Sequence, residues 1–184
     1  MKKLIAVFLC FFTICVVNAQ KPADVNSIIK QTCVEAGKQH KKAFIIFHAS
    51  WCIWCRKLDS SMNDVSCKKY FDSNFIITHL TAFEIDDKAK LNTPGNEAFL
   101  AAHHAIDQGI PTWFIFDENG NLLADSQLRH KGEGFDVEGS NVGCPSNETE
   151  INYFISILQK VSDISESNIT SVKARFLKNA ATHQ

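Results

Sequence analysis

The sequence predicts an α/β domain with three layers, in which helices cover both faces of a central mixed β-sheet. Short, continuous apolar runs at residues 43–47, 75–83 and 112–116 are typical of strands that are buried on both faces. Segments with the helical spacing of apolar residues alternate with these runs, which is the element order of an α/β fold. A turn at residues 117–121 contains Asn-Gly and precedes a fourth strand from Leu122, so the sheet also includes an antiparallel hairpin.

Helices are predicted where apolar residues recur every three or four positions. The first helix ends near Gly37, the second follows the first strand and includes Val65, and the third follows Pro94. A glycine-containing loop over residues 129–145 separates the hairpin from two further helices. In chain order, the apolar positions of the five helices lie within residues 25–36, 58–65, 97–102, 151–158 and 169–180.

The beginning of the chain has the pattern of a signal peptide. Lys2 and Lys3 precede an apolar run at residues 4–17, and the small residue Ala19 stands where a signal peptidase would cut. The run is shorter than the about 20 apolar residues that a membrane-spanning helix needs, which favours cleavage over a retained anchor. We therefore expect a signal peptide at residues 1–19, export to the periplasm or the medium, and no stable membrane insertion of the mature chain.

Composition excludes several classes of protein. The chain has 184 residues, of which 45% are hydrophobic and 21% charged, as is usual for a globular protein. Its formal net charge is -1, so no basic excess is available to neutralise phosphates, and nucleic acid is not expected among its partners. The sequence has no glycine-rich nucleotide motif, and we expect no flavin, nicotinamide or other cofactor.

The strongest chemical signal is the segment Trp51-Cys52-Ile53-Trp54-Cys55, at the junction of the first strand and the next helix. Cysteines three positions apart share one face of a helix and are close enough to form a disulfide. Cys52 is at the amino end, where the helix dipole favours a thiolate. A Cys52 thiolate can attack a substrate disulfide, and Cys55 can then resolve the mixed disulfide.

The residues alone also allow other roles for Cys52 and Cys55. A zinc site usually needs two more ligands, and no second close Cys or Cys/His pair accompanies this one. Covalent haem attachment needs His after the second cysteine, where this chain has Arg56. A purely structural disulfide is a further alternative. Of the other cysteines, Cys33 is expected in the core, whereas Cys67 and Cys144 can pair with each other, pair with Cys33 or stay free.

A second signal is Gly109-Ile110-Pro111-Thr112, directly before the third apolar run. A proline that opens a strand lacks the N–H group of the ladder, and a cis bond before it would leave the preceding backbone able to pair with an extended peptide. The same four residues also fit an ordinary trans turn.

Together, and in this order, the two motifs resemble the thioredoxin superfamily, over about residues 43–158. The resemblance implies that Cys52 is the nucleophile, that Cys55 resolves the mixed disulfide, and that the Ile110–Pro111 bond is cis and binds the substrate backbone. We expect a thioredoxin-like domain at residues 20–161, followed by a C-terminal helical extension at residues 162–184. The exported character and the residues before Cys52 are similar to those of bacterial periplasmic thioredoxin-like proteins.

The chain also departs from the family pattern. Thioredoxins carry a buried aspartate six residues before the first cysteine, where this chain has Ile46. Bulky Ile53 and Trp54 replace their Gly-Pro dipeptide, and with Trp51 they are expected to form an apolar rim that contacts substrate. His48 is interpreted as a structural histidine rather than a catalytic one.

Acidic residues after the second strand and a pair of histidines have no assigned chemistry. Glu84 and Asp86 are interpreted as a solvated strand end, with a substitute proton acceptor as the alternative. His103 and His104 are adjacent and cannot face one metal from one helix face, so we expect no metal there and interpret them as surface or capping residues.

These observations predict an exported thiol-disulfide oxidoreductase that reduces protein disulfides through Cys52 and Cys55. A partner protein of unknown identity would reduce the pair again. One alternative is a disulfide oxidase or isomerase of the same fold. Another is a non-enzymatic binding module of the thioredoxin fold, in which the Cys52–Cys55 disulfide is structural.

Overall fold

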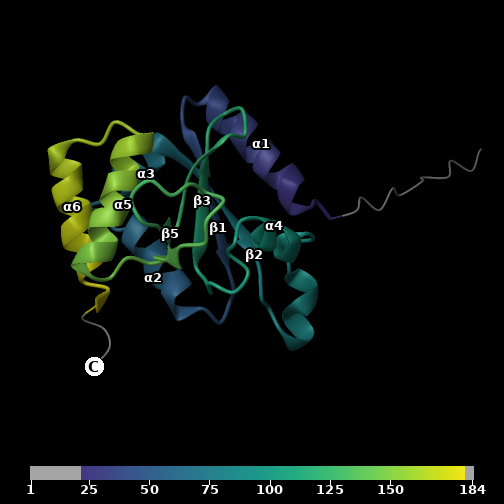
Figure 1. Ribbon diagram of the computed structural model, residues 1–184. Helices are drawn as coiled ribbons and strands as arrows, with labels where there is room; N and C mark the ends of the chain where they lie inside the picture. The colour runs from purple at the N-terminus through teal and green to yellow at the C-terminus, as the bar shows by residue number, and fades with distance from the viewer. Residues whose placement is uncertain (1–21, 181–184) are drawn as a thin grey trace, which may run out of the picture.

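A mixed four-stranded sheet forms the centre of the molecule (Figure 1). The computed structural model describes residues 22–180, so the signal peptide expected at residues 1–19 lies outside the described residues. The strand order is β2-β1-β3-β4, in which β1 runs parallel to β2 and antiparallel to β3, and β3 runs antiparallel to β4. The strands are β1 (Lys42–His48), β2 (Phe75–Thr81), β3 (Thr112–Phe116) and β4 (Leu122–Asp125). The predicted mixed sheet with its antiparallel hairpin is confirmed.

Helices cover both faces of this sheet, as the three-layer prediction requires. On one face lie α1 (Val25–Lys38) and α4 (Asn96–Ala102). On the other lie α2 (Ile53–Met62), α3 (Lys68–Asn74), α5 (Glu148–Val161) and α6 (Glu166–Leu177). Among the described residues, no helix has both the length and the apolar composition that crossing a membrane requires.

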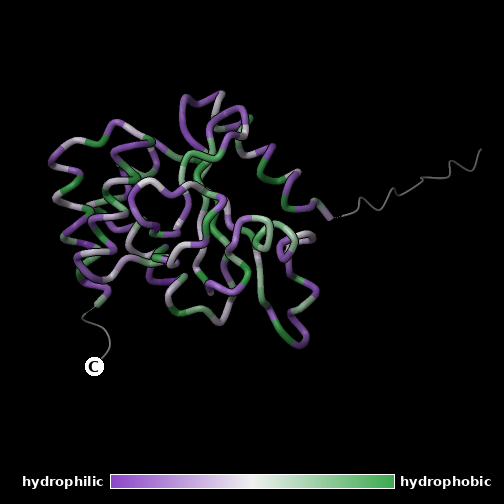
Figure 2. The backbone as a smooth tube through the Cα atoms, in the orientation of Figure 1, coloured by the Kyte–Doolittle hydropathy of each residue, from purple (hydrophilic) through white to green (hydrophobic). Residues whose placement is uncertain are grey.

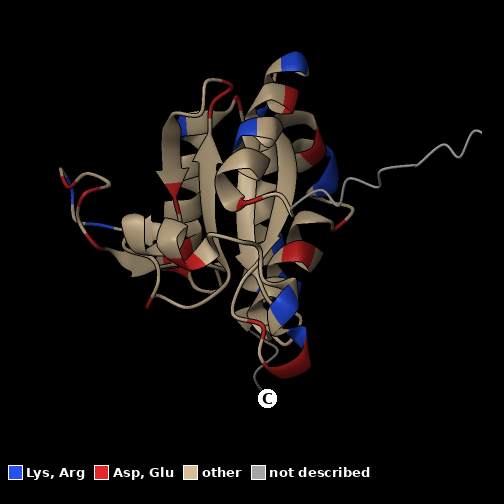
Figure 3. Ribbon diagram, turned by 90° about the vertical axis from the view of Figure 1, so that its right-hand side faces the viewer, with Lys and Arg blue, Asp and Glu red and all other residues tan. Residues whose placement is uncertain are grey.

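The alternation of β1 divides the core into two clusters. Successive side chains of a strand point to opposite faces, so Ile45 and Phe47 pack toward α1 and α4, while Phe44 and Ile46 pack toward the other four helices. All four side chains are buried, which explains the continuous apolar run in the sequence. Figure 2 shows hydrophobic colour along the central strands, and Figure 3 shows that most charged residues lie on the surrounding helices and loops.

The second predicted helix is wrong in its extent. It ends at Met62, and Val65 is 96% exposed instead of lying on the buried face. The chain turns here because Asp64 accepts hydrogen bonds from the backbone N–H of Ser66 through its side chain and from that of Cys67 through its carbonyl. The short helix α3 follows, which the apolar spacing did not predict.

Other differences lie in the connections. The second strand ends at Thr81 rather than Phe83, because Phe83 adopts a positive φ of 59° that strand geometry excludes. A 3-10 helix, η1, occupies Asp86–Leu91. Within the predicted glycine-containing loop, the short strands β5 (Gln127–Leu128) and β6 (Ser140–Asn141) pair antiparallel.

Candidate active site

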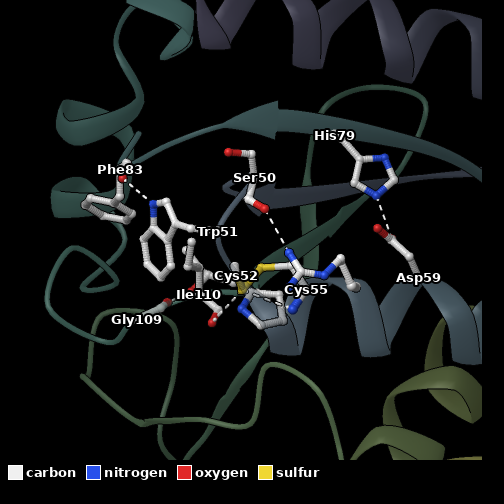
Figure 4. Close-up of a disulfide and its surroundings, with 12 residues drawn as sticks. Ser50, Trp51, Cys52, Cys55, Asp59, His79, Phe83, Gly109 and Ile110 are labelled. Carbon is white, nitrogen blue, oxygen red and sulfur yellow. Dashed lines mark hydrogen bonds and ion pairs between the residues drawn. A yellow bond between two sulfur atoms is a disulfide. The ribbon is translucent and has the colours of Figure 1, made fainter. Parts of the chain in front are cut away.

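Cys52 and Cys55 form a disulfide at the start of α2 (Figure 4). Cys52 is the N-cap residue of this helix, and its Sγ accepts a hydrogen bond of 3.0 Å from the backbone N–H of Cys55. That N–H is one of the groups that the first helical turn leaves without a backbone partner. The same donor and the positive end of the helix dipole would stabilise a Cys52 thiolate after reduction.

The path of the chain from β1 fixes the position of this sulfur. The strand ends at His48, and the N–H of Cys52 donates to the carbonyl of Ala49 at 3.1 Å, which closes a tight turn before the helix. Both cysteines are buried in the oxidised protein, with 3% and 2% of their surface exposed. A short connection thus places the disulfide at the end of a buried strand.

The second sequence motif lies directly against the first. The Ile110–Pro111 bond is cis, as the resemblance implied. The carbonyl oxygen of Ile110 lies 3.5 Å from Cys52 Sγ, and the Ile110 side chain packs against the disulfide (Figure 4). Pro111 is buried, and the carbonyl of Gly109 accepts a hydrogen bond from the Thr112 hydroxyl at 2.6 Å. The structure therefore brings together the two segments that carried the resemblance.

The bulky residues around the cysteines occupy two kinds of environment. Trp51 and Ile53 are 53% and 61% exposed, and the indole N–H of Trp51 donates to the Phe83 carbonyl at 2.9 Å. Trp54 is partly buried and packs against the disulfide cluster, with Lys57 Nζ 4.2 Å from the centre of its ring. The exposed part of the expected rim thus consists of Trp51 and Ile53.

Glu84 supports the turn before Cys52, and its interpretation as a solvated strand end is wrong. Its side chain accepts hydrogen bonds from the backbone N–H and the hydroxyl of Ser50, and the residue is 6% exposed. The bond from the Ser50 N–H is the main cause that lowers the pKa of Glu84. Lys88 Nζ also donates to the Ser50 hydroxyl at 2.9 Å, whereas Asp86 is exposed. The sequence did not predict this contact, because Ser50 and Glu84 belong to separate loops 34 positions apart.

A second polar group lies along α2. Asp59 is one helical turn beyond Cys55 and therefore on the same side of the helix. Its carboxylate points to His79 (Figure 4), and the distance to His79 Nε2 is 2.8 Å. His79 is the register partner of buried Ile46. The ring of His48 is 5.0 Å from that of His79, and burial lowers the pKa of His48. An acidic side chain of α2 is thus paired with the strand residue opposite Ile46. The sequence did not predict this pair, because Asp59 and His79 are 20 positions apart and form no motif.

The three other described cysteines are free and buried: Cys33, Cys67 and Cys144. Burial raises the pKa of all three thiols, and that of Cys144 to about 12. No group of three or more His, Cys, Asp or Glu side chains within residues 22–180 has the arrangement to hold a metal ion.

The two histidines that follow α4 differ in their surroundings. The ring of His103 packs on Phe99, with centroids 4.4 Å apart, and on Phe114 at 5.2 Å, so this residue is partly buried rather than on the surface. It also occupies the C-cap position, as the capping interpretation proposed, while His104 is exposed.

Comparisons with solved structures give distant similarities. A disulphide isomerase from Xylella fastidiosa Temecula1 is 20% identical, with a TM-score of 0.44 over 59% of this chain and 77% of that one. The C-terminal domain of DsbD from Neisseria meningitidis, in its oxidised form, is 16% identical, with a TM-score of 0.43 over 77% of this chain and 99% of that one. A DsbH oxidoreductase is 17% identical, with a TM-score of 0.41 over 85% and 95% of the two chains. No curated protein matches the sequence.

A family model also matches this chain. The family model of a thioredoxin-like domain matches residues 29–128, which is more than half of the chain. The matched part contains β1, the disulfide, the Ile110–Pro111 bond and the whole four-stranded sheet. With a Cys-x-x-Cys disulfide at the start of α2, the chain has the architecture of a thiol-disulfide oxidoreductase, and it belongs to the thioredoxin-like family.

Proposed function

We propose that this protein is an exported thiol-disulfide oxidoreductase that reduces disulfides of protein substrates. One observation carries the proposal. Cys52 Sγ lies between an N–H donor at the start of α2 and the backbone of Ile110, where a nucleophilic sulfur and a bound peptide would meet. Catalytic roles for Cys52 and Cys55, and substrate contacts by Trp51, Ile110 and Pro111, follow from this arrangement.

In the first step, the reduced protein attacks the substrate. The Cys52 thiolate, stabilised by the Cys55 N–H, attacks one sulfur of a substrate disulfide. The substrate S–S bond breaks, a bond forms between Cys52 and the attacked sulfur, and the other substrate sulfur leaves as a thiolate that takes up a proton. The product of this step is a mixed disulfide.

In the second step, Cys55 releases the substrate. Its thiol gives up a proton and attacks Cys52 Sγ, which forms the disulfide present in the structure and frees the second substrate sulfur. The substrate has then gained two electrons and the protein has lost two. A dithiol protein partner must supply two electrons to begin the next cycle.

We propose that the Asp59–His79 pair accepts the proton of Cys55. A group that takes a proton in the transition state must lie near the donor or reach it through one water. Asp59 follows Cys55 by one helical turn, and His79 holds its carboxylate at 2.8 Å. The pair would therefore assist the second step and leave the first unchanged.

The substrate backbone is proposed to pair with Ile110. Within the described residues, the N–H of Ile110 has no hydrogen-bond partner, and its carbonyl oxygen meets only Cys52 Sγ. Unpaired backbone groups of this kind can add an extended peptide. A hollow of about 240 Å³ beside them, lined by Trp54, Pro111 and Cys144, offers room for a substrate side chain.

Export and domain organisation are part of the proposal. The pattern at residues 1–19 supports a cleaved signal peptide and a periplasmic or secreted location. Residues 20–161 would then form the catalytic domain, followed by the extension at residues 162–184. Sequencing the amino terminus of the exported protein tests the cleavage after Ala19.

The reduction potential of the Cys52–Cys55 pair tests the proposed direction. The mature protein is equilibrated in thiol/disulfide buffers, and the redox state of the pair is determined by mass. A value near the thioredoxin end of the scale, roughly -270 mV, supports a reductase, whereas one near about -120 mV makes the protein an oxidant. A pair that stays oxidised below about -300 mV is structural and favours a binding module.

A further inference from the structure

A groove of about 530 Å³ lies between α2 and the C-terminal end of α6, next to the disulfide. Ile53, the residue after Cys52, lines one end of it with an exposed side chain. The helices meet here because Lys57 Nζ donates to the Asn179 carbonyl at 3.2 Å and the Ser61 hydroxyl donates to Asn179 Oδ1 at 3.1 Å. Figure 1 shows the lower end of α6 beside α2. The family match ends at residue 128, so α6 adds this wall outside the matched domain.

The groove is strongly cationic. Four basic residues line it, Arg56, Lys57, Arg175 and Lys178, and among the described residues that line it only Asp64 carries a carboxylate. Asp64 is paired with Arg175 at 3.1 Å, and none of the three other basic residues forms an ion pair with any described residue. This local excess contrasts with the formal net charge of -1 for the whole chain. A surface of one sign attracts a partner of the opposite sign.

Hydrogen bonds to uncharged backbone carbonyls hold two of these basic side chains in place. Arg56 donates to the Ser50 carbonyl at 2.8 Å, and Lys57 is held by the Asn179 carbonyl. Asn179 itself is 3% exposed and donates to the carbonyl of Pro145, which anchors this end of the chain. Because the side chains are already ordered, an anionic ligand would lose less conformational entropy on binding them.

We infer that this groove binds an acidic segment of the substrate protein, next to the disulfide that Cys52 attacks. The inference rests on the proposed function and names the substrate class. Arg56 is four residues beyond Cys52, which is on the order of 6 Å along the helix. An extended peptide covers that distance in about two residues. The preferred substrate therefore carries Asp or Glu two to four residues from its reactive cysteine, and an apolar side chain can contact Ile53.

The test compares two disulfide peptides that differ only in charge. One carries Asp and Glu at the second to fourth positions from its cysteine, and the other carries Ser and Gln. We expect the mature protein to reduce the acidic peptide with about tenfold higher kcat/KM at low ionic strength, and the difference to vanish in high salt. The variant Lys178→Glu should lose most of this preference and reduce the neutral peptide at the wild-type rate. Equal kcat/KM for the two peptides with the wild-type protein overturns the inference.

Matched controls separate this inference from its alternatives. Lys30→Glu introduces the same charge change on α1, on the opposite face of the sheet, and should keep the preference. Equal losses in both variants would show a general charge effect and contradict a specific groove. Glutathione disulfide is tested as a third substrate. If Lys178→Glu slows the reduction of glutathione disulfide but of neither peptide, the groove does not bind a polypeptide and the inference is wrong.

A binding measurement distinguishes failure of the inference from failure of the proposed function. A fluorescent acidic peptide without cysteine should bind the oxidised protein, as measured by anisotropy, and bind Lys178→Glu about tenfold more weakly. If neither disulfide peptide is reduced but the acidic peptide still binds, the proposed reductive function is wrong and the inferred binding groove is supported. Absence of binding together with equal reduction of both peptides contradicts the groove alone.

Discussion

Two sulfur atoms of the protein lie in opposite surroundings. Cys52 Sγ receives a backbone N–H at a helix start, whereas Cys144 is buried among apolar side chains that raise its pKa to about 12. The thiolate is the nucleophilic form, and a thiol with that pKa stays protonated at pH 7. Reactivity should therefore be confined to the Cys52–Cys55 pair.

Alkylation of the reduced protein tests this difference. At neutral pH, iodoacetamide should modify Cys52 in the native protein, because the start of α2 favours its thiolate. Cys33, Cys67 and Cys144 should stay unmodified, because burial raises the pKa of each and keeps it a thiol. The modified sites are identified by mass after digestion. The denatured protein is the control, in which all of these cysteines should react. Native Cys144 reacting as fast as Cys52 would contradict the expected order.

The proposed proton acceptor predicts a defect in one step. Asp59→Asn keeps the shape of the side chain but removes the carboxylate that His79 holds. We expect resolution by Cys55 to slow by about 10- to 100-fold, since general base catalysis is typically worth at least that much. Acid quenching and mass measurement should then show accumulation of the mixed disulfide, with an unchanged rate of the first attack.

Asp72→Asn is the matched control for that substitution. Asp72 is an exposed residue of α3 that pairs with Lys68 at 3.0 Å, away from the disulfide. Its replacement should leave both steps unchanged. A mixed disulfide that decays equally fast in Asp59→Asn and the wild type would exclude Asp59 as the acceptor.

At the scale of elements, α6 is joined to the domain by core packing. Ile169, Val172 and Phe176 lie in the same hydrophobic cluster as α2 and α5, and the ring centroids of Phe176 and Phe154 are 5.2 Å apart. Helix α6 thus shares the core of the domain that carries the disulfide. Loss of this packing would also remove one wall of the cationic groove.

Phe176→Ala tests how strongly α6 is held. The side chain is fully buried, so its truncation should lower the free energy of unfolding by about 3–5 kcal/mol, as measured by urea denaturation. Leu177→Ala is the control, because Leu177 is 50% exposed and its replacement should cost less than about 1 kcal/mol. Similar losses in the two variants would mean that α6 does not pack on the core as described.

The elements differed in how well the sequence predicted them. The central strands were predictable because their apolar runs are local and continuous, and the Cys52–Cys55 pair because its spacing matches one helix face. Helix α3 was not predictable. Only Tyr70 and Phe71 of its seven residues are buried, so its apolar residues do not recur at helical spacing. The bond between Glu84 and Ser50 spans 34 positions, so it depends on the tertiary fold.

For the whole molecule, partly buried histidines link stability to pH. Burial lowers the pKa of both His48 and His103 below the ordinary value of 6.5. The unfolded chain therefore binds more protons than the folded one as the pH falls through 6.5, and stability declines in that range. The lowered pKa of Glu84 affects stability in a different pH range. Ionised Glu84 stabilises the folded state above its ordinary pKa of 4.5, and this stabilisation is lost only as the pH falls below that value.

Denaturation at two pH values tests this linkage. The wild-type protein should be less stable at about pH 5.5 than at about pH 7.5, and the double variant His48→Gln/His103→Gln should show a smaller difference. His130→Gln is the control, since His130 lies in an exposed loop. Equal pH dependence of the double variant and the wild type would contradict the assigned cause.

The position of the disulfide in the chain has a consequence for the redox cycle. It joins residues only 3 positions apart, so it restricts the unfolded chain far less than a long-range cross-link. Loop-closure entropy over so short a loop amounts to about 2 kcal/mol, against roughly 4.7 kcal/mol for a loop of 100 residues. The other described thiols are unpaired. The fold of residues 22–180 is therefore held by its two large hydrophobic clusters and not by long-range disulfides. We therefore expect the fold to persist when the Cys52–Cys55 bond is reduced, so that the pair can take up and give away two electrons without unfolding of the chain.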